Sequence, residues 1–240
     1  MGLRGGAARA RRMDGDDASK AEVVRLRDPA ATQARILAAA KAEFAQKGLA
    51  GARIDQIAHR AKANKRMIYH YFGSKDDLFL AVLEEAYGDI RAKERELDLE
   101  HLDPVRAITR LVEFTWTYYL ENPEFLHLIN SENLHKAIHL KRSTRIKEMH
   151  SPFVAMVEHV LERGVVAGLF RAGLDPVQLN VSIAALGYYY LTNRYTSSII
   201  FGVDLGSKEM LERRRAVIVD TVLRYVLTDP AALDTGPAGR

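Results

Sequence analysis

The segment KRMIYHYFGSKDDL, Lys65–Leu78, gathers three Lys and Arg side chains and four aromatic rings in fourteen residues. Residues 69–72 are the consecutive rings Tyr, His, Tyr and Phe. Successive residues of a helix point about 100° apart, so these rings cannot all face one core. Some of them must face a partner outside the core.

The residue types in this segment suit contact with DNA. Lys65 and Arg66 can donate hydrogen bonds to guanine O6 and N7 in a major groove. The hydroxyls of Tyr69 and Tyr71 can reach phosphates, while their rings can pack on thymine methyl groups. Lys75 adds an ammonium group to the start of the next helix, where phosphate binds well. The sequence therefore predicts a DNA-reading helix.

Three predicted helices position this segment. The first runs from Thr32, an N-cap residue, to Lys47, and Gly48 stops it. The second covers about residues 54–61, and the third begins at Asn64 and ends near Gly73. Two short helices joined by a tight turn form a helix-turn-helix unit, whose last helix enters the major groove. The predicted core residues are Ile36, Leu37, Ala40, Phe44, Ala45, Ile54, Ile57, Ala58, Ile68 and Phe72.

Charge divides the chain in the same way. Residues 28–75 carry nine Lys and Arg against three Asp and Glu, and residues 1–27 carry seven against four. Residues 76–240 carry nineteen against twenty-four. A solvated basic surface is one explanation of such an excess, and a nucleic-acid-binding first third is the other.

Composition and motif content exclude several classes of function. The 240 residues contain no cysteine, which excludes disulfides, thiolate zinc sites and cysteine nucleophiles. No apolar run approaches the roughly 20 residues of a membrane span, and no signal-peptide pattern occurs, so a cytoplasmic protein without a membrane partner is expected. No G-x-S-x-G, H-E-x-x-H, Walker or dinucleotide-binding motif occurs, so neither an enzyme nor a cofactor is predicted.

Residues 52–86, ARIDQIAHRAKANKRMIYHYFGSKDDLFLAVLEEA, resemble the N-terminal domain of TetR-type bacterial transcriptional repressors. The matching positions are Ile57, Ala58, Tyr69, Phe72, Lys75 and Leu78, and the resemblance extends over about residues 30–86. It implies DNA contacts at Arg53, Lys65, Arg66, Met67, Tyr69, Tyr71 and Lys75.

Two residues depart from the family pattern. Arg53 stands where the family usually has Thr or Ser, so a helix cap is lost while a cation is gained. Lys62 stands where a turn glycine is common, so either the turn avoids positive φ or Lys62 accepts strain. The resemblance therefore supports major-groove binding but does not transfer an operator sequence.

The remainder of the chain is predicted to be helical, because no segment alternates with period two. The predicted helices cover residues 74–99, 104–121, 123–140, 144–168, 176–200 and 207–228. The expected organisation of this all-α protein is a flexible basic arm over 1–27, a DNA-binding domain over 28–75, a helical effector-binding and dimerisation domain over 76–228, and an unpacked tail over 229–240.

The resemblance implies that the second domain binds a small molecule and dimerises through its last two helices. Residues suited to line an effector pocket are Trp116, Tyr119, Phe125, Glu132, Asn133, His135, His139, Tyr189 and Arg194. The apolar faces expected to meet a second subunit are Leu179, Ile183, Leu186, Tyr190 and Ser197, and Met210, Val217, Thr221 and Tyr225. Two recognition helices about 34 Å apart also require a dimer.

Two side-chain groups in this domain leave alternatives open. On a continuous helix, Glu132, His135 and His139 would share one face, where they could bind a divalent metal, orient an effector or simply make hydrogen bonds between helices. No metal site is predicted from them. Arg194 needs an anion, which is either Glu132 or a ligand carboxylate.

The function predicted from these features is a ligand-responsive transcriptional regulator. Its expected partners are a double-stranded DNA operator, a small-molecule effector of unknown identity and a second copy of the chain. Release from the operator by the effector would make it a repressor. A transcriptional activator of the same fold is the first alternative, and a helical metal-binding enzyme is a more remote one.

Overall fold

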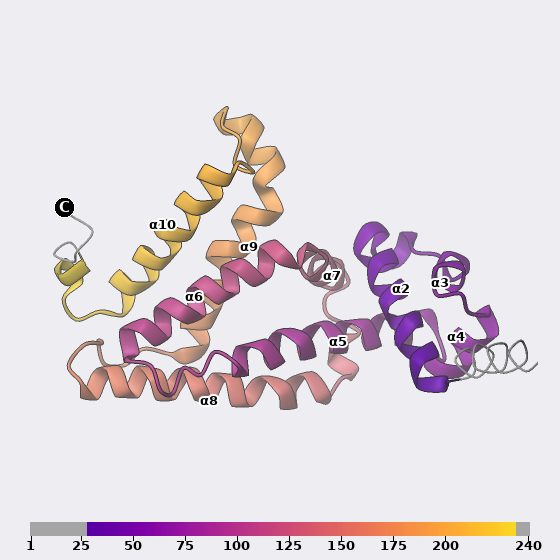
Figure 1. The fold of residues 1–240 in the computed structure, drawn as a ribbon, viewed down its shortest axis with the longest axis horizontal. Helices are drawn as coiled ribbons and strands as arrows, with labels where there is room; N and C mark the ends of the chain where they lie inside the picture. The colour runs from indigo at the N-terminus through magenta and orange to yellow at the C-terminus, as the bar shows by residue number, and fades with distance from the viewer. Residues whose placement is uncertain (1–27, 234–240) are drawn as a thin grey trace, which may run out of the picture.

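The computed structural model describes residues 28–233, so the expected arm over 1–27 and the end of the expected tail, 234–240, lie outside the described residues. Within the described part the chain forms α-helices and no strand, which confirms the all-α prediction (Figure 1). The helices are α2 (Pro29–Gly51), α3 (Ile54–Arg60), α4 (Lys65–Phe72), α5 (Lys75–Arg95), α6 (Pro104–Glu121), α7 (Pro123–Leu134), α8 (Arg145–Val166), α9 (Pro176–Phe201) and α10 (Lys208–Val226), with 3-10 helices η1 (Leu140–Arg142) and η2 (Pro230–Leu233).

Local sequence signals explain where most of these helices begin. The side chains of Asp28, Asn64, Ser74, Asp103, Asp175 and Ser207 accept hydrogen bonds from the N–H groups that follow them. The predicted cap Thr32 is wrong, because Asp28 caps α2 by accepting from Ala30 N at 2.9 Å, and Thr32 is buried one turn later. Gly48 has φ of 66° and interrupts α2 where a stop was predicted.

The helices are arranged as a small unit joined to a larger one. In Figure 1, α2, α3 and α4 lie together at the right, and α5 leaves them to run beside α8. Helices α9 and α10 form a hairpin whose closed end projects from the molecule (Figure 1). No helix of the described part combines the length and apolarity that crossing a membrane requires.

The predicted helix over 123–140 is wrong beyond Leu134. Lys136 and Ala137 have φ of 55° and 57°, and η1 follows them. The cause lies in Glu132, whose buried carboxylate accepts the backbone N–H groups of His139 (2.9 Å) and Leu140 (3.0 Å). These hydrogen bonds bring residues seven and eight positions later back to the end of α7, which a continuing helix could not do.

The expected unpacked tail from Asp229 also differs from the structure at its start. Pro230–Leu233 forms η2, and Leu233 packs partly buried against the core. The apolar side chain of Leu233 therefore holds the end of the described chain against the core.

The helix-turn-helix turn contains a strained residue. Lys62 has φ of 50°, in the left-handed region that glycine adopts without steric cost. The sequence left open whether the turn avoids positive φ or Lys62 is strained, and in the structure Lys62 has the strained conformation. A non-glycine residue in this region costs on the order of 1 kcal/mol.

We predict that Lys62→Gly raises the free energy of unfolding by about 0.5–1 kcal/mol, because glycine removes the strain. Urea denaturation of the full chain measures the change. Glu85→Gly, at an exposed helical position of α5, is the control and should lose about 1 kcal/mol. Equal losses in the two variants would show that Lys62 is not strained.

Candidate functional site

Helix α4 exposes most of the predicted DNA-reading residues. Asn64 caps the helix by accepting a hydrogen bond from Arg66 N at 2.8 Å. Ile68 is fully buried and fixes α4 to its neighbours, as predicted. The exposed residues of α4 are Lys65, Arg66, Tyr69 and His70. The capped start of the helix therefore presents two cations side by side.

Met67 and Tyr71, also predicted to touch DNA, are half-buried. Tyr71 packs against the core, and its ring centroid lies 6.4 Å from that of Phe72. The structure thus gives Tyr71 a packing role beside any role at the surface. Tyr69, at 44% exposed, is the tyrosine of α4 that is open to a partner.

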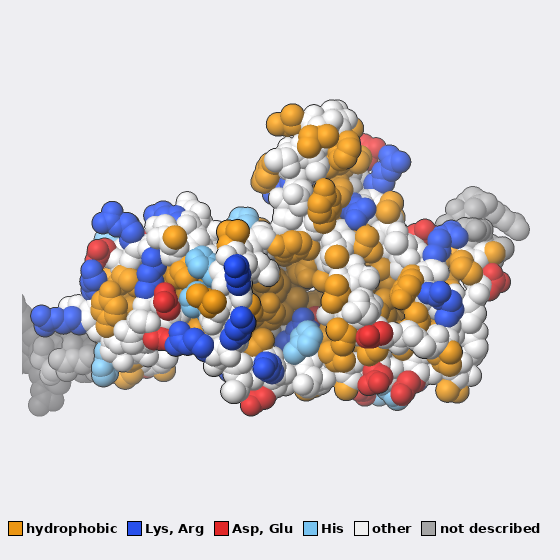
Figure 2. All heavy atoms as spheres, turned by 180° about the vertical axis from the view of Figure 1, so that it is seen from behind, with side chains coloured by type: hydrophobic (Ala, Val, Ile, Leu, Met, Phe, Trp, Pro, Cys, Tyr) orange, Lys and Arg blue, Asp and Glu red, His pale blue; other side chains and the backbone are white. Residues whose placement is uncertain are grey.

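Lys65 is engaged by an acidic neighbour that sequence reasoning missed. Its Nζ lies 2.9 Å from Asp55 Oδ1 on α3, and both side chains are exposed. The hydrogen bond and charge of this pair lower the pKa of Asp55 and raise that of Lys65. Figure 2 shows the Lys and Arg side chains over the α2–α4 end, with acidic groups between them. A DNA phosphate would compete with Asp55 for Lys65.

Arg53 begins α3 without a side-chain cap, as its residue type predicts. Its backbone N–H instead donates to Glu43 Oε1 at 3.3 Å, and Lys47 Nζ donates to the same oxygen at 2.9 Å. Burial alone would raise the pKa of Glu43, but these hydrogen bonds and charges bring it below its usual value. A buried carboxylate of α2 thus anchors the start of α3 and leaves the guanidinium of Arg53 exposed.

Ser74 and Asp77 form a reciprocal cap at the start of α5. Ser74 Oγ accepts from Asp77 N at 3.0 Å and donates to Asp77 Oδ2 at 2.6 Å. Asp77 also pairs with Arg142, which follows α7. Lys75 Nζ donates to the carbonyl of Ala50 at 3.4 Å. The predicted phosphate contact Lys75 therefore sits where α2, α5 and the 135–144 segment approach one another.

Glu132 and His139 are buried and bind each other instead of facing a cavity. His139 Nδ1 lies 2.6 Å from Glu132 Oε2, and the ring of Phe79 packs edge-on against His139. The predicted shared helical face is wrong, because α7 ends before His135, whose Nδ1 meets the carbonyl of Ser131. Nowhere in the described residues do three His, Asp or Glu side chains lie close enough to hold one metal ion.

Three other predicted pocket residues lie in the interior of the second domain. Trp116 and Phe125 are 3% exposed and Tyr119 is 8% exposed. Phe125 stacks on Tyr119 with ring centroids 6.1 Å apart. Gly187 of α9 approaches this cluster so closely that an added Cβ would lie 3.4 Å from the Tyr119 ring.

The remaining predicted pocket residues point elsewhere. Asn133 is exposed and its amide donates to the carbonyl of Ile129. Tyr189 is 65% exposed on α9. Arg194 donates to the hydroxyl of Tyr195 at 2.8 Å and lies over its ring. Of the two anions that the sequence left open for Arg194, Glu132 is therefore not its partner, because Glu132 binds His139 and Leu140. These residues do not converge with Trp116 and Tyr119.

A buried ion pair in the same interior was not predicted. Arg91 and Glu94 of α5 are 8% and 3% exposed, and Arg91 Nη1 lies 2.9 Å from Glu94 Oε2. The geometry of this contact is poor, so Arg91 Nε, Arg91 Nη1 and Glu94 Oε2 have no hydrogen-bond partner. Burial raises the pKa of Glu94 to about 7, against the opposing charges of Arg91 and Arg95.

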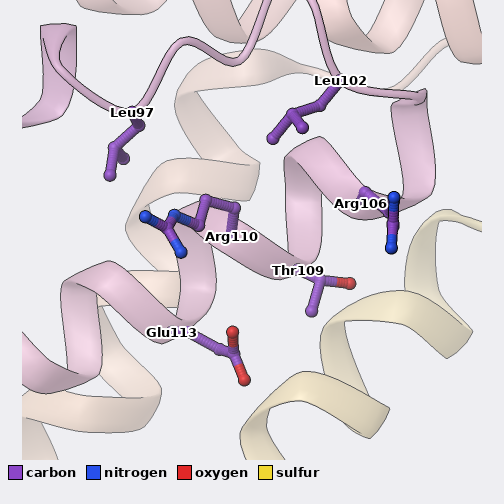
Figure 3. Close-up of a pocket in the computed structure, with 6 residues that line it drawn as sticks. All are labelled: Leu97, Leu102, Arg106, Thr109, Arg110 and Glu113. Atoms are coloured by element: carbon purple, nitrogen blue, oxygen red, sulfur yellow. The ribbon is translucent and has the colours of Figure 1, made fainter.

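Cavities open beside several helices. One of about 450 Å³ lies between the 97–102 connection and α6; Figure 3 shows Leu97 and Leu102 on one side of it and Arg110 on the other. Two more, of about 520 and 490 Å³, lie at the α8–α9 connection and between α2 and α7. A fourth, of about 30 Å³, is lined by Arg91 and Glu94. None of these four is lined by the predicted pocket residues.

These features define a class of protein: a helix-turn-helix unit with an exposed basic helix, joined to a larger helical domain. Comparison with known families agrees. Residues 36–82 match the family model described as "Bacterial regulatory proteins, tetR family", and residues 104–222 match "Tetracyclin repressor-like, C-terminal domain". The chain belongs to the TetR family of transcriptional regulators.

Relatives cover most of the chain. HTH-type transcriptional repressor NicS of Pseudomonas putida is 38% identical over 201 residues, 84% of this chain and 95% of the relative. HTH-type transcriptional repressor SCO4008 of Streptomyces coelicolor is 34% identical over 198 residues, 81% of this chain and 98% of the relative.

Solved structures share the fold. A tetR-family regulatory protein from Rhodococcus RHA1 superposes with a TM-score of 0.64 at 19% identity, covering 82% of this chain and 98% of that one. FadR from Bacillus subtilis, solved in complex with stearoyl-CoA, superposes with a TM-score of 0.57 at 16% identity, covering 80% and 97%.

We predict that Asp55→Asn strengthens binding to a random DNA duplex by roughly twofold to fivefold, because Lys65 loses its competing partner. The plot of log affinity against log salt should steepen by up to about 1. Fluorescence anisotropy measures both. Glu96→Gln, which removes an exposed acidic charge at the far end of α5, should leave both unchanged. No gain in Asp55→Asn would mean that Lys65 does not reach the DNA.

Proposed function

We propose that this protein is a ligand-responsive transcriptional repressor, which binds an operator through α4 and leaves it when a small molecule occupies the second domain. The observation that carries this proposal is the exposed basic start of α4, held by a buried scaffold and continued through α5 into the interior of the second domain. In this proposal residues 28–75 bind DNA, whereas residues 76–228 bind the effector and dimerise. Such work on chromosomal DNA would place the protein in the cytoplasm.

Two relatives support the repressor assignment, because NicS and SCO4008 are both named transcriptional repressors. The structure of FadR with stearoyl-CoA shows that a protein of this fold holds a small molecule. An effector can release DNA only if it binds the non-DNA-binding arrangement more tightly than the other.

The proposed DNA contacts divide by position on the surface. Lys65 and Arg66 at the capped start of α4 read base edges, with Met67 and Tyr69 beside them. Exposed Arg53 and half-buried Lys75, at the starts of α3 and α5, hold phosphates, since helix N-termini favour anions. Tyr71 is half-buried, and its exposed part contacts the DNA.

The proposed dimer face lies on α9 and α10. Helix α9 has one charged residue, Arg194, in 26 residues, yet much of its surface is exposed. Its apolar residues open to a partner include Val181, Tyr189, Ile199 and Ile200, and Figure 2 shows hydrophobic side chains over the projecting end of the hairpin. An uncharged exposed helix face of this length favours burial against a second copy.

The proposed face differs from the one that the sequence predicted for α9. Leu179, Ile183 and Ser197, expected to meet the partner, are buried within the same chain. The exposed stripe lies on the other side of the helix and includes Tyr189, which was expected in the pocket. For α10, Val217 and Tyr225 are 45% and 46% exposed, which is compatible with the expected face.

The experiment that tests DNA reading begins with selection of bound duplexes from a random library. We predict that Lys65→Ala and Arg66→Ala relax the selected sequence and cost about 1–3 kcal/mol on the preferred site. Lys75→Ala should weaken all sequences alike and reduce the salt slope by about 1. A uniform loss in all three variants would contradict the assignment of base readers.

The dimer has its own test. We predict that Tyr189→Glu converts the protein to a monomer in sedimentation equilibrium, because a buried unpaired carboxylate opposes association. Val166→Glu places the same charge on a 90% exposed residue at the end of α8 and should leave the dimer intact. A dimeric Tyr189→Glu protein would place the interface elsewhere.

A further inference from the structure

Among the residues of the second domain that the structure describes, Arg91 is buried and has two guanidinium nitrogens without a hydrogen-bond partner. It is 8% exposed, and its Nε and Nη1 have no hydrogen-bond partner. An ionised guanidinium in a protein interior is costly unless it is paired and fully hydrogen-bonded. Glu94 neutralises the charge at 2.9 Å but leaves those donors unsatisfied.

The surroundings of Arg91 are apolar and able to rearrange. The guanidinium carbon lies 4.2 Å from the ring centre of Phe153 on α8. Met149 and Met156 of α8 line the adjoining cavity together with Pro152. The cavity has a volume of about 30 Å³, room for on the order of two water molecules. A larger group would need Met149 and Met156, whose side chains are flexible, to change rotamer.

We infer that Arg91 is the anchor for a carboxylate-bearing effector whose flat or apolar body lies between α5 and α8. This inference deepens the proposed function, on which it rests, by naming the chemical class of the effector. A carboxylate can accept two parallel hydrogen bonds from one guanidinium, which supplies the partners that Glu94 leaves missing. The thioether and aromatic side chains of α8 suit an apolar body.

The protonation state of Glu94 sets the net charge of the site when a ligand carboxylate binds. Arg91 is the buried cation of the site, and Arg95, which also lines the cavity, is exposed to solvent. Two carboxylates beside Arg91 repel each other, so the protonated form of Glu94 accepts the ligand. The charged and titratable groups that act on this pair are Tyr87 and Arg95 of α5, Tyr118 and Tyr119 of α6, and His150 of α8. Because the pKa of Glu94 in the ligand-free protein is about 7, Glu94 must take up a proton when a carboxylate binds above that pH.

The affinity of the site for a carboxylate should therefore depend on pH and fall as the pH rises. Below pH 7 Glu94 is largely protonated and the affinity for a carboxylate is nearly constant. Above pH 7 the affinity should fall by up to about tenfold per pH unit, because each binding event first protonates Glu94. Glu94→Gln is neutral at every pH, so ligand binding no longer needs a proton, and this variant should bind carboxylates at pH 8.5 more than tenfold more tightly than the native chain.

Three carboxylates serve as probes: benzoate, phenylacetate and cyclohexanecarboxylate, each compared with its uncharged amide by calorimetry on the full chain. At least one carboxylate should bind at least tenfold more tightly than its amide at pH 6.5. Arg91→Gln should abolish this preference, whereas Arg110→Gln, an exposed arginine of α6 beside the separate cavity of Figure 3, should retain it.

Equal binding of every acid and its amide, or unchanged binding to Arg91→Gln, would overturn the inference. If Arg91→Gln does not fold cooperatively, the comparison of the native chain with Glu94→Gln decides, because loss of the pH dependence is expected only for a carboxylate that competes with Glu94.

Operator release is measured separately by anisotropy with the selected duplex. A carboxylate that binds through Arg91 without releasing DNA would uphold the site and contradict the proposed ligand response. If the protein binds its operator but binds none of the three acids, the result would contradict the Arg91 site and leave the proposed function intact.

Discussion

The continuity of α5 is the constraint on which the other features depend. At 1.5 Å per residue its 21 residues extend about 31 Å, from the reciprocal Ser74–Asp77 cap to the Arg91–Glu94 pair. Its first turns bury Leu78 and Phe79 against α2, while its last turns lie beside α8 in the second domain. A rigid helix that packs against other helices near both of its ends cannot shift at one end without moving what packs on the other. In the proposed mechanism this helix carries the effector response to α4.

The 135–144 segment is a second tie between the two units, and it depends on one buried carboxylate. The Glu132 carboxylate accepts hydrogen bonds from the backbone N–H groups of His139 and Leu140, and its other oxygen pairs with the His139 ring. These contacts offset the free-energy cost of burying the carboxylate. The segment then reaches α5 through Phe79 against His139, Ser143 to Glu84 and Arg142 to Asp77. Movement of α5 must therefore either carry this segment along or break these contacts.

How far the sequence predicts this structure depends on the range of each interaction. The helix-turn-helix unit, its Asn64 and Ser74 caps and the burial of Ile68 follow from local spacing, and they are confirmed. The end of α7 could not be predicted, because it depends on Glu132 binding residues beyond the helix. The Arg91–Glu94 pair was missed because an i,i+3 ion pair is the pattern of an exposed helix face. The approach of α8, whose Phe153 packs on Arg91, helps to turn that face into the interior.

Among the strained or unsatisfied residues in the described part of the chain, Lys62 and Arg91 lie at places that the proposed function uses. Lys62 holds a left-handed backbone in the turn that aims α4, and Arg91 keeps unsatisfied donors in the interior of the second domain. Each lowers stability, and neither is required by the cores around it, which are filled by aliphatic and aromatic side chains. Functional sites are places where such local departures from the best agreement of sequence and structure are expected. In the proposed mechanism the cost at Arg91 has a use: a ligand that completes its hydrogen bonds gains free energy only in the arrangement that admits it, which is the differential affinity that a switch requires.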